Sequence, residues 1–457
     1  MSKSRSKTTK TAKKSTPDPS IALVCDWLTT PGGAEKVLLE LHQMYPDAPI
    51  YTSQYRPKKI AWFNTAIVRT GWLNLFPACL RKLLGPLRAL YFSHLDLSHY
   101  DLVISVTGAE AKAVKTNYHI CYCHVPTQYY WQMYDQYIKN PGFGFLNPLV
   151  RLALKCLIKP LRQADFRAAQ RPDQFVTISS YAAAQIKQFY HRDAKIIAPP
   201  VDISRFSPFS TTSPQKSTRN PQEIHQKSEL LHKNPQEIHK KSTKNPNFST
   251  KIHIFSTFFP QLFHRSTEST PTTVSRNEPY FVISCRQVTW KRVDLAIKGC
   301  ILAQKRLVVI GDGPEHHHLE TLATPLIHFI PWLDAKELSQ YLQSATAYIF
   351  PSLEPFGIAA VEALAAGCPV IAYKAGGSQD IIQPGKNGLF FAKQTPESLA
   401  KALKSFQSSD YSRSAVSSTA TKFSSKHFRS NISQLVSAFS EQSSKSQNPK
   451  PQEGTKL

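Results

Sequence analysis

The sequence lacks several features that would place it in a particular class of protein. No uninterrupted apolar run reaches the roughly 18 residues that a membrane-spanning helix needs. The basic N-terminal residues 1–20 are followed by no apolar segment of the signal-peptide type. The eight cysteines never form a Cys-x-x-Cys pair, which favours buried, reduced thiols. We therefore expect a protein that acts in the cytoplasm.

Patterns that bind metal are also lacking. Cys121, Cys123 and His124 stand close together, but a zinc site needs further ligands at usable spacing and none is nearby. The sequence has no Asp-x-Asp element that could hold a divalent cation beneath a diphosphate. We expect neither a metal ion nor another cofactor.

Acidic residues are too few to balance the basic ones, and the formal net charge is +25. This charge suggests an anionic partner, and a nucleic-acid-binding protein is one alternative. However, nearly half of the excess lies in residues 1–20, 207–278 and 442–457, whose composition is typical of disorder. No known nucleic-acid-binding motif is present, so no nucleic acid is expected as a partner.

Short apolar stretches alternate with helical patterns on both sides of a segment rich in Ser, Thr, Asn, Pro and Lys. Such alternation predicts parallel βαβ units. We expect an α/β protein with two Rossmann-like domains that face one another across a cleft. The expected parts are a disordered basic tail (1–20), an N-terminal Rossmann-like domain (21–206), a low-complexity insertion or linker (207–278), a C-terminal Rossmann-like domain (279–441) and a disordered tail (442–457).

The stretch "EPFGIAAVEALAAGCPVIAY" is the most informative motif. Pro355 and Gly357 delay the helix until Ile358, so Glu354 lies in the preceding loop and Glu362 about one turn inside the helix. Phosphates could bind the free amides at the helix start, while one carboxylate binds a ribose diol and the other a second sugar. This arrangement favours a nucleotide-sugar site over two unrelated surface glutamates.

Three further motifs follow expected strands. In "TTPGGAEKV", Gly33 could let the backbone approach an anion, although a simple tight turn explains the glycines equally well. In "SCRQVTWKRVD", Arg286 and Lys291 could clamp a diphosphate or form a solvated charge cluster. In "VVIGDGPE", a nucleotide pocket and plain turn chemistry remain alternatives.

These motifs resemble retaining glycosyltransferase family 4, the glycosyl transferases group 1, of GT-B fold. The resemblance rests on the E-x7-E pair, "SCRQVTWKRVDLAI", "VVIGDGPE" and "AAGCPVIAYKAGGSQDII". The stretches "VCDWLTTPGGAEKVLLEL", "YDLVIS" and "HICYCHVPTQYYW" are similar to the branch that includes O-antigen and capsule mannosyltransferases. The resemblance covers residues 21–206 and 279 to about 441, and it implies that the first of these is an acceptor domain and the second a nucleotide-sugar-binding domain.

The resemblance implies a role for each matching residue. It implies that Arg286 and Lys291 bind the donor diphosphate and that Gly33 contacts the donor at the glycine loop. Glu354, together with the Gly357 and Ile358 amides, would bind the transferred sugar, and Glu362 would bind the ribose. His124 would lie near the reacting sugar. The chain departs from the branch at Gln128 and Gln132, where the branch carries Arg and Asp, and this departure leaves the acceptor open.

The implied activity is that of a metal-independent, retaining hexosyltransferase. The favoured donor is GDP-mannose, and the implied acceptor is a lipid-linked glycan or a polysaccharide of the cell envelope. The base, the sugar and the linkage stay open. A catalytically inactive GT-B scaffold is an alternative, which the intact set of Arg286, Lys291, Glu354 and Glu362 disfavours.

Two basic stretches suggest peripheral contact with an anionic membrane, on the inner face of the cell membrane. "LNLFPACLRKLLGPLRALYF" contains Arg81, Lys82 and Arg88, and "PLVRLALKCLIKPLR" places four cations at helical spacing, namely Arg151, Lys155, Lys159 and Arg162. The alternative is two helices packed on their domain and interrupted by Pro86 and Pro160.

Overall fold

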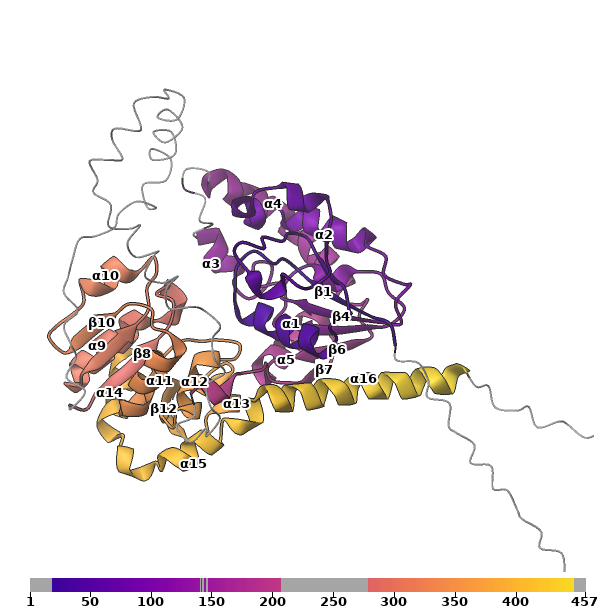
Figure 1. The fold of residues 1–457 in the computed structure, drawn as a ribbon. Coiled ribbons are helices and arrows are strands. Elements are labelled where there is room, and N and C mark those ends of the chain that lie inside the picture. The colour runs from indigo at the N-terminus through magenta and orange to yellow at the C-terminus, as the bar shows by residue number, and fades with distance from the viewer. Residues whose placement is uncertain (1–18, 140, 142–143, 145–146, 207–277, 448–457) are drawn as a thin grey trace, which may run out of the picture. The chain divides into compact units, whose positions relative to one another are not determined.

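The computed structural model describes residues 19–139, 141, 144, 147–206 and 278–447. Most of the predicted N-terminal tail, all but Glu278 of the predicted insertion, and residues 448–457 lie outside this part of the chain. The described residues form two parallel β-sheets surrounded by helices (Figure 1). This architecture confirms the predicted α/β class with two Rossmann-like sheets.

The first sheet has seven parallel strands in the order β3-β2-β1-β4-β5-β6-β7. They are β1 (Ile21–Cys25), β2 (Ile50–Thr52), β3 (Val68–Thr70), β4 (Leu102–Thr107), β5 (His119–Cys123), β6 (Gln174–Thr177) and β7 (Ala194–Ile196). Both β4 and β5 are buried along their whole length, as expected of central parallel strands covered on both faces. The carboxyl ends of β1, β4 and β5 therefore lie side by side at the point where the strand order reverses.

The second sheet has six strands in the order β10-β9-β8-β11-β12-β13. They are β8 (Phe281–Ser284), β9 (Leu307–Ile310), β10 (Ile327–Ile330), β11 (Ala347–Phe350), β12 (Val370–Tyr373) and β13 (Gly388–Phe391). The order reverses between β8 and β11, so a ligand site is expected beyond the carboxyl ends of these two strands. Both strands are fully buried and apolar apart from Ser284 and Tyr348.

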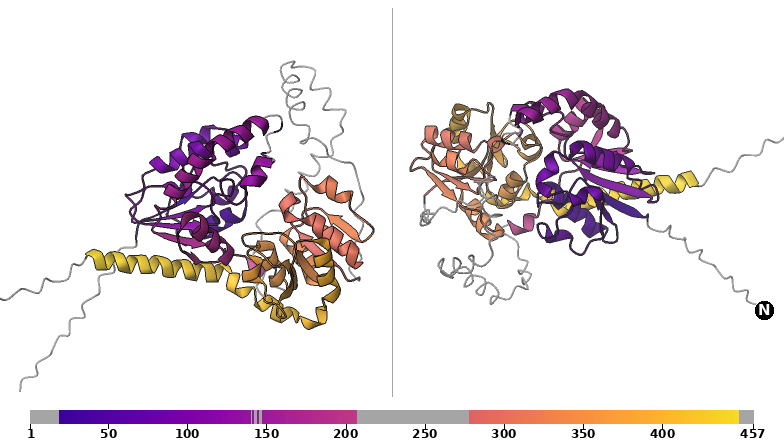
Figure 2. Two further views of the ribbon diagram at one scale, coloured as in Figure 1. Left: turned by 180° about the vertical axis from the view of Figure 1, so that it is seen from behind. Right: turned by 90° about the horizontal axis from the view of Figure 1, so that it is seen from above.

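Helices cover the strands of each sheet (Figure 2). In the first half they are α1 (Gly33–Met44), α2 (Gly85–His94), α3 (Tyr134–Lys139), α4 (Asn147–Ala168) and α5 (Ser180–Tyr190). In the second half they are α9 (Val293–Ala303), α10 (His316–Glu320), α11 (Ala335–Ser344), α12 (Ile358–Ala365), α13 (Ser378–Ile381), α14 (Pro396–Ser405), α15 (Arg413–Ser418) and α16 (Ser425–Gln447). The buried leucines of α9 and α14 join the strand residues in one apolar core.

The last helix, α16, packs against the first sheet. Phe428 meets Tyr122 of β5 edge-on at 5.9 Å between ring centroids, and Phe439 meets Tyr118 at 4.6 Å. Arg429 also forms an ion pair with Glu40 of α1. The sequence assigned residues up to 441 to the second domain, but the aromatic partners of α16 lie on the first sheet, and the helix continues to Gln447.

Pro160 does not interrupt α4, as one alternative assumed. The stretch before Pro86 does consist of separate pieces, because 3-10 turns cover Trp72–Leu75 and Ala78–Lys82 and α2 begins only at Gly85. Pro86 occupies the first turn of α2, where its missing N–H costs nothing. Helix α4 runs through Pro160. Proline leaves the carbonyl of Cys156, four residues earlier, without its helical hydrogen bond. Among the described helices, none combines the length and apolar character that crossing a membrane requires.

Candidate functional site

The loop between β11 and α12 carries the two glutamates of the E-x7-E pattern. Gly357 has a φ of +127°, and a Cβ atom there would lie 2.8 Å from Cζ of Phe350. Only glycine suits this position. The chain therefore enters the helix at Ile358, and Glu354 lies in the loop while Glu362 lies in α12, as the spacing predicts. The first amides of α12 have no carbonyl of their own helix to bond.

Each of these glutamates lies beside a lysine. Glu354 Oε1 is 2.7 Å from Lys291 Nζ, and Glu362 Oε1 is 3.7 Å from Lys36 Nζ. Both carboxylate side chains are 18% exposed. Burial raises the pKa of Glu362, against the opposing charges of Lys36 and Arg205. The structure thus pairs two of the predicted donor-binding residues, Lys291 and Glu354, and adds Lys36, which the sequence did not indicate.

Tyr348 of β11 lies within the electrostatic reach of both glutamates. Its hydroxyl donates to the carbonyl of Ser284 on β8 at 2.9 Å. Burial raises the pKa of Tyr348 well above its usual value, and the charges of Glu354 and Glu362 add to this effect. The Lys291–Glu354 pair joins the segments that follow β8 and β11, where the strand order predicts a ligand site.

The predicted cations follow β8. Lys291 ends a short 3-10 turn, and Arg286 has an exposed side chain nearer the strand. A Cβ atom at Gly313 would lie 2.3 Å from the carbonyl oxygen of Gln287. The backbone amide of Gln287 also donates to the carbonyl of Asp312 at 2.9 Å. Gly313, the second glycine of "VVIGDGPE", is thus needed for close backbone packing. This packing supports the loop that carries Arg286.

Gly33 begins α1 on the first sheet. A Cβ atom at Gly33 would lie 3.2 Å from Cδ1 of Ile358. The structure therefore brings together two residues that the sequence assigned to the donor. Nearby, Ser180 at the start of α5 donates its amide and hydroxyl to Asp380 at 2.7 and 2.6 Å. These contacts join α1 to the start of α12, and α5 to α13.

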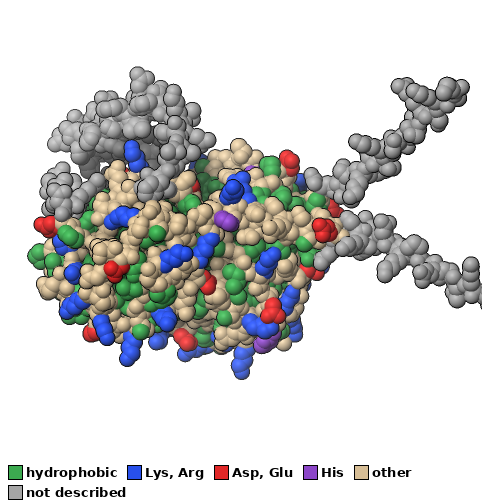
Figure 3. All heavy atoms as spheres, turned by 90° about the horizontal axis from the view of Figure 1, so that it is seen from below, with side chains coloured by type: hydrophobic (Ala, Val, Ile, Leu, Met, Phe, Trp, Pro, Cys, Tyr) green, Lys and Arg blue, Asp and Glu red, His purple; other side chains and the backbone are tan. Residues whose placement is uncertain are grey.

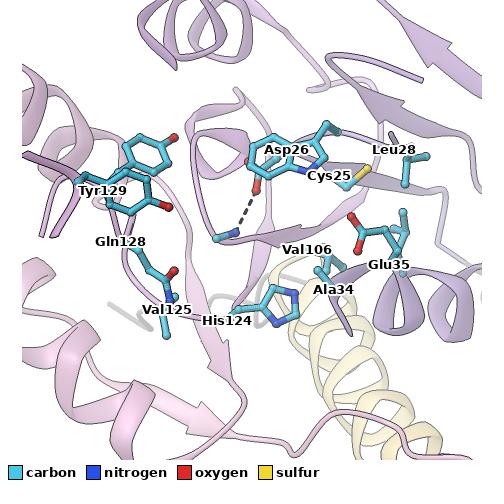
Figure 4. A pocket seen from close by; sticks show the side chains of 14 residues that line it. Cys25, Asp26, Leu28, Ala34, Glu35, Val106, His124, Val125, Gln128 and Tyr129 are labelled. Carbon is cyan, nitrogen blue, oxygen red and sulfur yellow. Dashed lines mark hydrogen bonds between the residues drawn. The ribbon is translucent and has the colours of Figure 1, made fainter. Parts of the chain in front are cut away.

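His124 lies in a cavity of about 320 Å³ at the carboxyl ends of β1, β4 and β5 (Figure 4). Its backbone amide donates to the carbonyl of Thr107 at 2.9 Å, but its buried Nε2 atom has no hydrogen-bond partner in the described structure. Burial lowers the pKa of His124 to about 4. The imidazole is therefore neutral near pH 7 and is available to a ligand hydroxyl.

Glu35 is a second polar group of this cavity, and the sequence reasoning missed it. It lies in the first turn of α1, and Figure 4 shows its carboxylate and the His124 ring directed toward the same space. Burial raises the pKa of Glu35 to about 7, while its own backbone amide and Arg81 oppose this effect. Its position directly after "GGA" was the only feature of the sequence that could have marked Glu35 as a residue of the site. The remaining walls are largely apolar and aromatic, including Trp27, Tyr129 and Tyr137.

Buried ionic networks hold the wall of the cavity. Lys112 Nζ is 2.7 Å from Asp165 Oδ1, and the other carboxylate oxygen accepts from Trp131 Nε1 at 2.8 Å and from the Tyr190 hydroxyl at 2.7 Å. Burial lowers the pKa of Lys112, but the charge of Asp165 outweighs burial and raises this pKa well above its usual value. These contacts fix the segment after β5, which carries Gln128 into the cavity.

The two basic stretches have different outcomes. Arg88 is 2% exposed and lies 2.9 Å from Glu110, while Arg81 donates to Thr29 Oγ1 at 2.7 Å. The prediction of a basic surface is therefore wrong for Arg88, which Glu110 holds in the interior, while Arg81 is only half-buried. On α4, Arg151, Lys155 and Lys159 are exposed, as membrane contact would require, and the contact itself stays a prediction.

Residues 265–423 match the family model described as glycosyl transferases group 1. Among curated proteins, the chain is 36% identical over 101 residues to an uncharacterized glycosyltransferase of Methanocaldococcus jannaschii, covering 21% of this chain and 26% of that protein. It is 39% identical over 85 residues to a GDP-mannose-dependent alpha-mannosyltransferase of Corynebacterium glutamicum, covering 18% of this chain and 20% of that protein. The matches thus span about a quarter of these relatives or less.

Solved structures extend the likeness to nearly the whole chain. HepE of Anabaena, in complex with UDP, superposes with a TM-score of 0.57 at 18% identity, covering 92% of this chain and 100% of that one. Sucrose-phosphate synthase from Thermosynechococcus elongatus gives a TM-score of 0.55 at 15% identity, with coverages of 91% and 97%. These likenesses show that the fold is GT-B.

Proposed function

We propose that the chain is a retaining glycosyltransferase that moves a hexose from a nucleotide sugar to a lipid-linked glycan or polysaccharide in the cytoplasm. The observation that carries the proposal is the convergence at the start of α12. There the Lys291–Glu354 pair, Glu362 and the free amides lie beside the glycine turn of α1. A donor needs groups of these kinds for its diphosphate, ribose and sugar.

In this proposal, fixed positive charge drives the departure of the diphosphate. Arg286, Lys291 and the amides of α12 stabilise the negative charge that develops on the leaving group, without a metal ion. Glu354 binds hydroxyls of the transferred sugar, and Glu362 binds the ribose. The acceptor attacks from the face that the diphosphate leaves, so the anomeric configuration is retained. The glutamates are not a glycosidase pair, because one of them binds ribose.

GDP-mannose is the proposed donor, and UDP-glucose is the second candidate. The stretch matched by the GDP-mannose-dependent alpha-mannosyltransferase supports the first. The likeness to HepE, which has been solved with UDP-glucose, supports the second. A direct comparison of the two donors decides between them.

We place the acceptor in the cavity of the first sheet. Its aromatic walls suit the apolar face of a sugar ring, while His124 and Glu35 offer partners for hydroxyl groups. His124 is neutral near pH 7, so it can accept a hydrogen bond from the attacking hydroxyl without first losing a proton.

Helix α4 is the proposed membrane contact. Leu149, Leu152 and Leu157 are 65%, 61% and 47% exposed. Exposed Lys155 and Lys159 lie on the same helix. Exposed leucines next to cations suit the surface of an anionic membrane, where a lipid-linked acceptor would be found.

The nucleic-acid alternative has less support from the surface. On the face that Figure 3 shows, Lys and Arg side chains are spread over the described residues with Asp and Glu between them. A nucleic-acid site is expected to gather its cations in one patch or stripe. Short duplex DNA nevertheless belongs in the first experiment as a competitor.

The test is a calorimetric titration of the full chain with GDP-mannose, UDP-glucose, UDP-N-acetylglucosamine and short duplex DNA, each with and without EDTA. We expect saturable binding of one nucleotide sugar that EDTA does not change. Glu362→Gln should weaken this binding about tenfold through the loss of a charged hydrogen bond to the ribose. Binding of DNA alone, weakening steeply with salt, would falsify the proposal.

A further inference from the structure

We propose that Lys36 is a ligand of the donor diphosphate, contributed by the first sheet to a site otherwise built on the second. The inference rests on the proposed function, and it adds a residue that the motifs do not indicate. It starts from the position of α1, whose first residue, Gly33, packs against Ile358 at the start of α12. Lys36 lies three residues further along the same helix and therefore on a neighbouring surface.

The present partner of Lys36 is held only loosely. Its Nζ atom lies 3.7 Å from Glu362 Oε1, well beyond the roughly 2.7–2.9 Å of a strong charge-assisted hydrogen bond. The lysine side chain is 47% exposed, so its ammonium is largely hydrated. Lys291, by contrast, lies 2.7 Å from Glu354 and is 23% exposed. Lys36 can therefore exchange its partner at little cost.

The helix that carries Lys36 is firmly placed. Glu40, one turn further along α1, pairs with Arg429 and accepts the hydroxyl of Ser425 at 3.2 Å. A movement of the Lys36 ammonium from Glu362 to a phosphate thus needs only side-chain rotation. The long, flexible side chain of lysine suits such a role.

The charges at this corner also favour a third cation. Glu354 and Glu362 offset the positive charges of Arg286 and Lys291. Arg205 and Asp202, which also act on Glu362, offset one another. Lys36 adds a third cation to Arg286 and Lys291, against the two carboxylates of Glu354 and Glu362. A nucleotide sugar carries negative charge on its diphosphate, and a net positive site attracts it.

Occupation of the site would release Glu362 for the ribose. In the structure, Lys36 and Glu362 neutralise one another. When the donor binds, the ammonium turns to the diphosphate and the carboxylate accepts the ribose hydroxyls, so that both charges gain a partner. The same step links a side chain of the first sheet to a ligand held by the second.

The test compares Lys36→Met with the wild-type chain by calorimetric titration. The probes are GDP-mannose, GDP and guanosine, or their uridine counterparts if the wild type binds UDP-glucose. We expect Lys36→Met to weaken the diphosphates about tenfold and the nucleoside less than twofold. Lys36→Arg should keep most of the affinity, and the difference between variants should shrink as salt rises.

The controls separate failure of this inference from failure of the proposed function. Lys187→Met is the matched control, because Lys187 is an exposed lysine of α5 that pairs with Asp193 at 2.8 Å. If the wild type binds a nucleotide sugar and Lys36→Met binds it equally well, the inference is wrong. Equal losses for nucleoside and diphosphate also overturn it, because Lys36 would then only orient Glu362. If the wild type binds neither donor, the proposed function fails and the inference fails with it.

Discussion

The cavity on the first sheet and the corner on the second hold their functional side chains by different means. The cavity wall depends on buried charge pairs. Lys112 and Asp165 are 1% and 3% exposed, and Arg88 and Glu110 are each 2% exposed. In the corner, the charged side chains that pair with one another are between 18% and 47% exposed, and close packing of glycine backbone sets their positions.

This difference implies different roles for the charges. A buried pair has no water to replace a lost partner, so its members are fixed and their loss destabilises the fold. A pair that water can still reach adds less to stability, and its members can exchange one partner for another. The corner is therefore suited to binding and releasing an anion, while the charges of the cavity wall maintain its shape.

The strongest test of this comparison is Lys112→Met. We expect a loss of about 3–5 kcal/mol in the free energy of unfolding, because Asp165 would stay buried without its cation. Urea unfolding measures the loss. The double variant Lys112→Met with Asp165→Asn should recover part of it, since no unpaired charge then remains. A loss below about 1 kcal/mol, like that of an exposed pair, would remove the distinction between the two regions.

Lys291→Met should show the opposite behaviour. We expect transfer to fall about 100-fold, because one fixed cation is lost from the departing diphosphate. The free energy of unfolding should change by less than in Lys112→Met, because Lys291 and Glu354 are 23% and 18% exposed and water can reach both side chains. Initial rates with the donor that binds give the first quantity, and urea unfolding gives the second. A large loss of stability with unchanged transfer would contradict the proposed role.

The corner could be predicted from the sequence because its logic is local. Pro355 and Gly357 fix where the helix begins, and the spacing alone then separates Glu354 from Glu362. The meeting of Lys291 with Glu354 also follows from a general rule, since both lie beyond the ends of neighbouring parallel strands. Charge pattern and strand order were sufficient here.

The remaining parts of the site depend on partners distant in the sequence. Arg88 turns inward because Glu110 lies beside it in the fold, and no local pattern shows this. Lys36 meets Glu362 only because α1 packs on the start of α12. Likewise, the amphipathic pattern of α16 shows that it must pack, but the pattern does not identify the first sheet as its partner.

Gly357→Ala tests the backbone side of the comparison. Alanine strains a φ of +127°, and its Cβ atom would lie 2.8 Å from the Phe350 ring. We expect a loss of about 1–3 kcal/mol in the free energy of unfolding together with weaker donor binding. Gly385→Ala is the control, because its φ of +75° is also positive but open space surrounds it. Equal donor affinities in the two variants would count against the importance of the packing at Gly357.

Glu35→Gln tests the titratable group of the cavity. Because burial raises the pKa of Glu35 from 4.5 to about 7, its stabilising contribution is complete below pH 4.5 and is lost as the pH rises through 7. The variant should therefore become more stable than the wild type as the pH rises from 4.5 to 7, and the difference at pH 8 should be on the order of 3 kcal/mol. Thermal unfolding at pH 5 and pH 8 checks this, and a difference that is independent of pH would contradict it.

The smallest expected effect concerns α4, whose cations are exposed, unlike Lys112. Lys159→Gln should weaken binding to vesicles that contain phosphatidylglycerol about fivefold, since one cation near such a surface contributes about 1 kcal/mol. Its free energy of unfolding should not change, because the side chain is exposed. Co-sedimentation measures the binding, with phosphatidylcholine vesicles and the α5 variant Lys187→Gln as controls. An equal loss in Lys187→Gln would mean that net charge, and not the leucine-flanked face of α4, attracts the membrane.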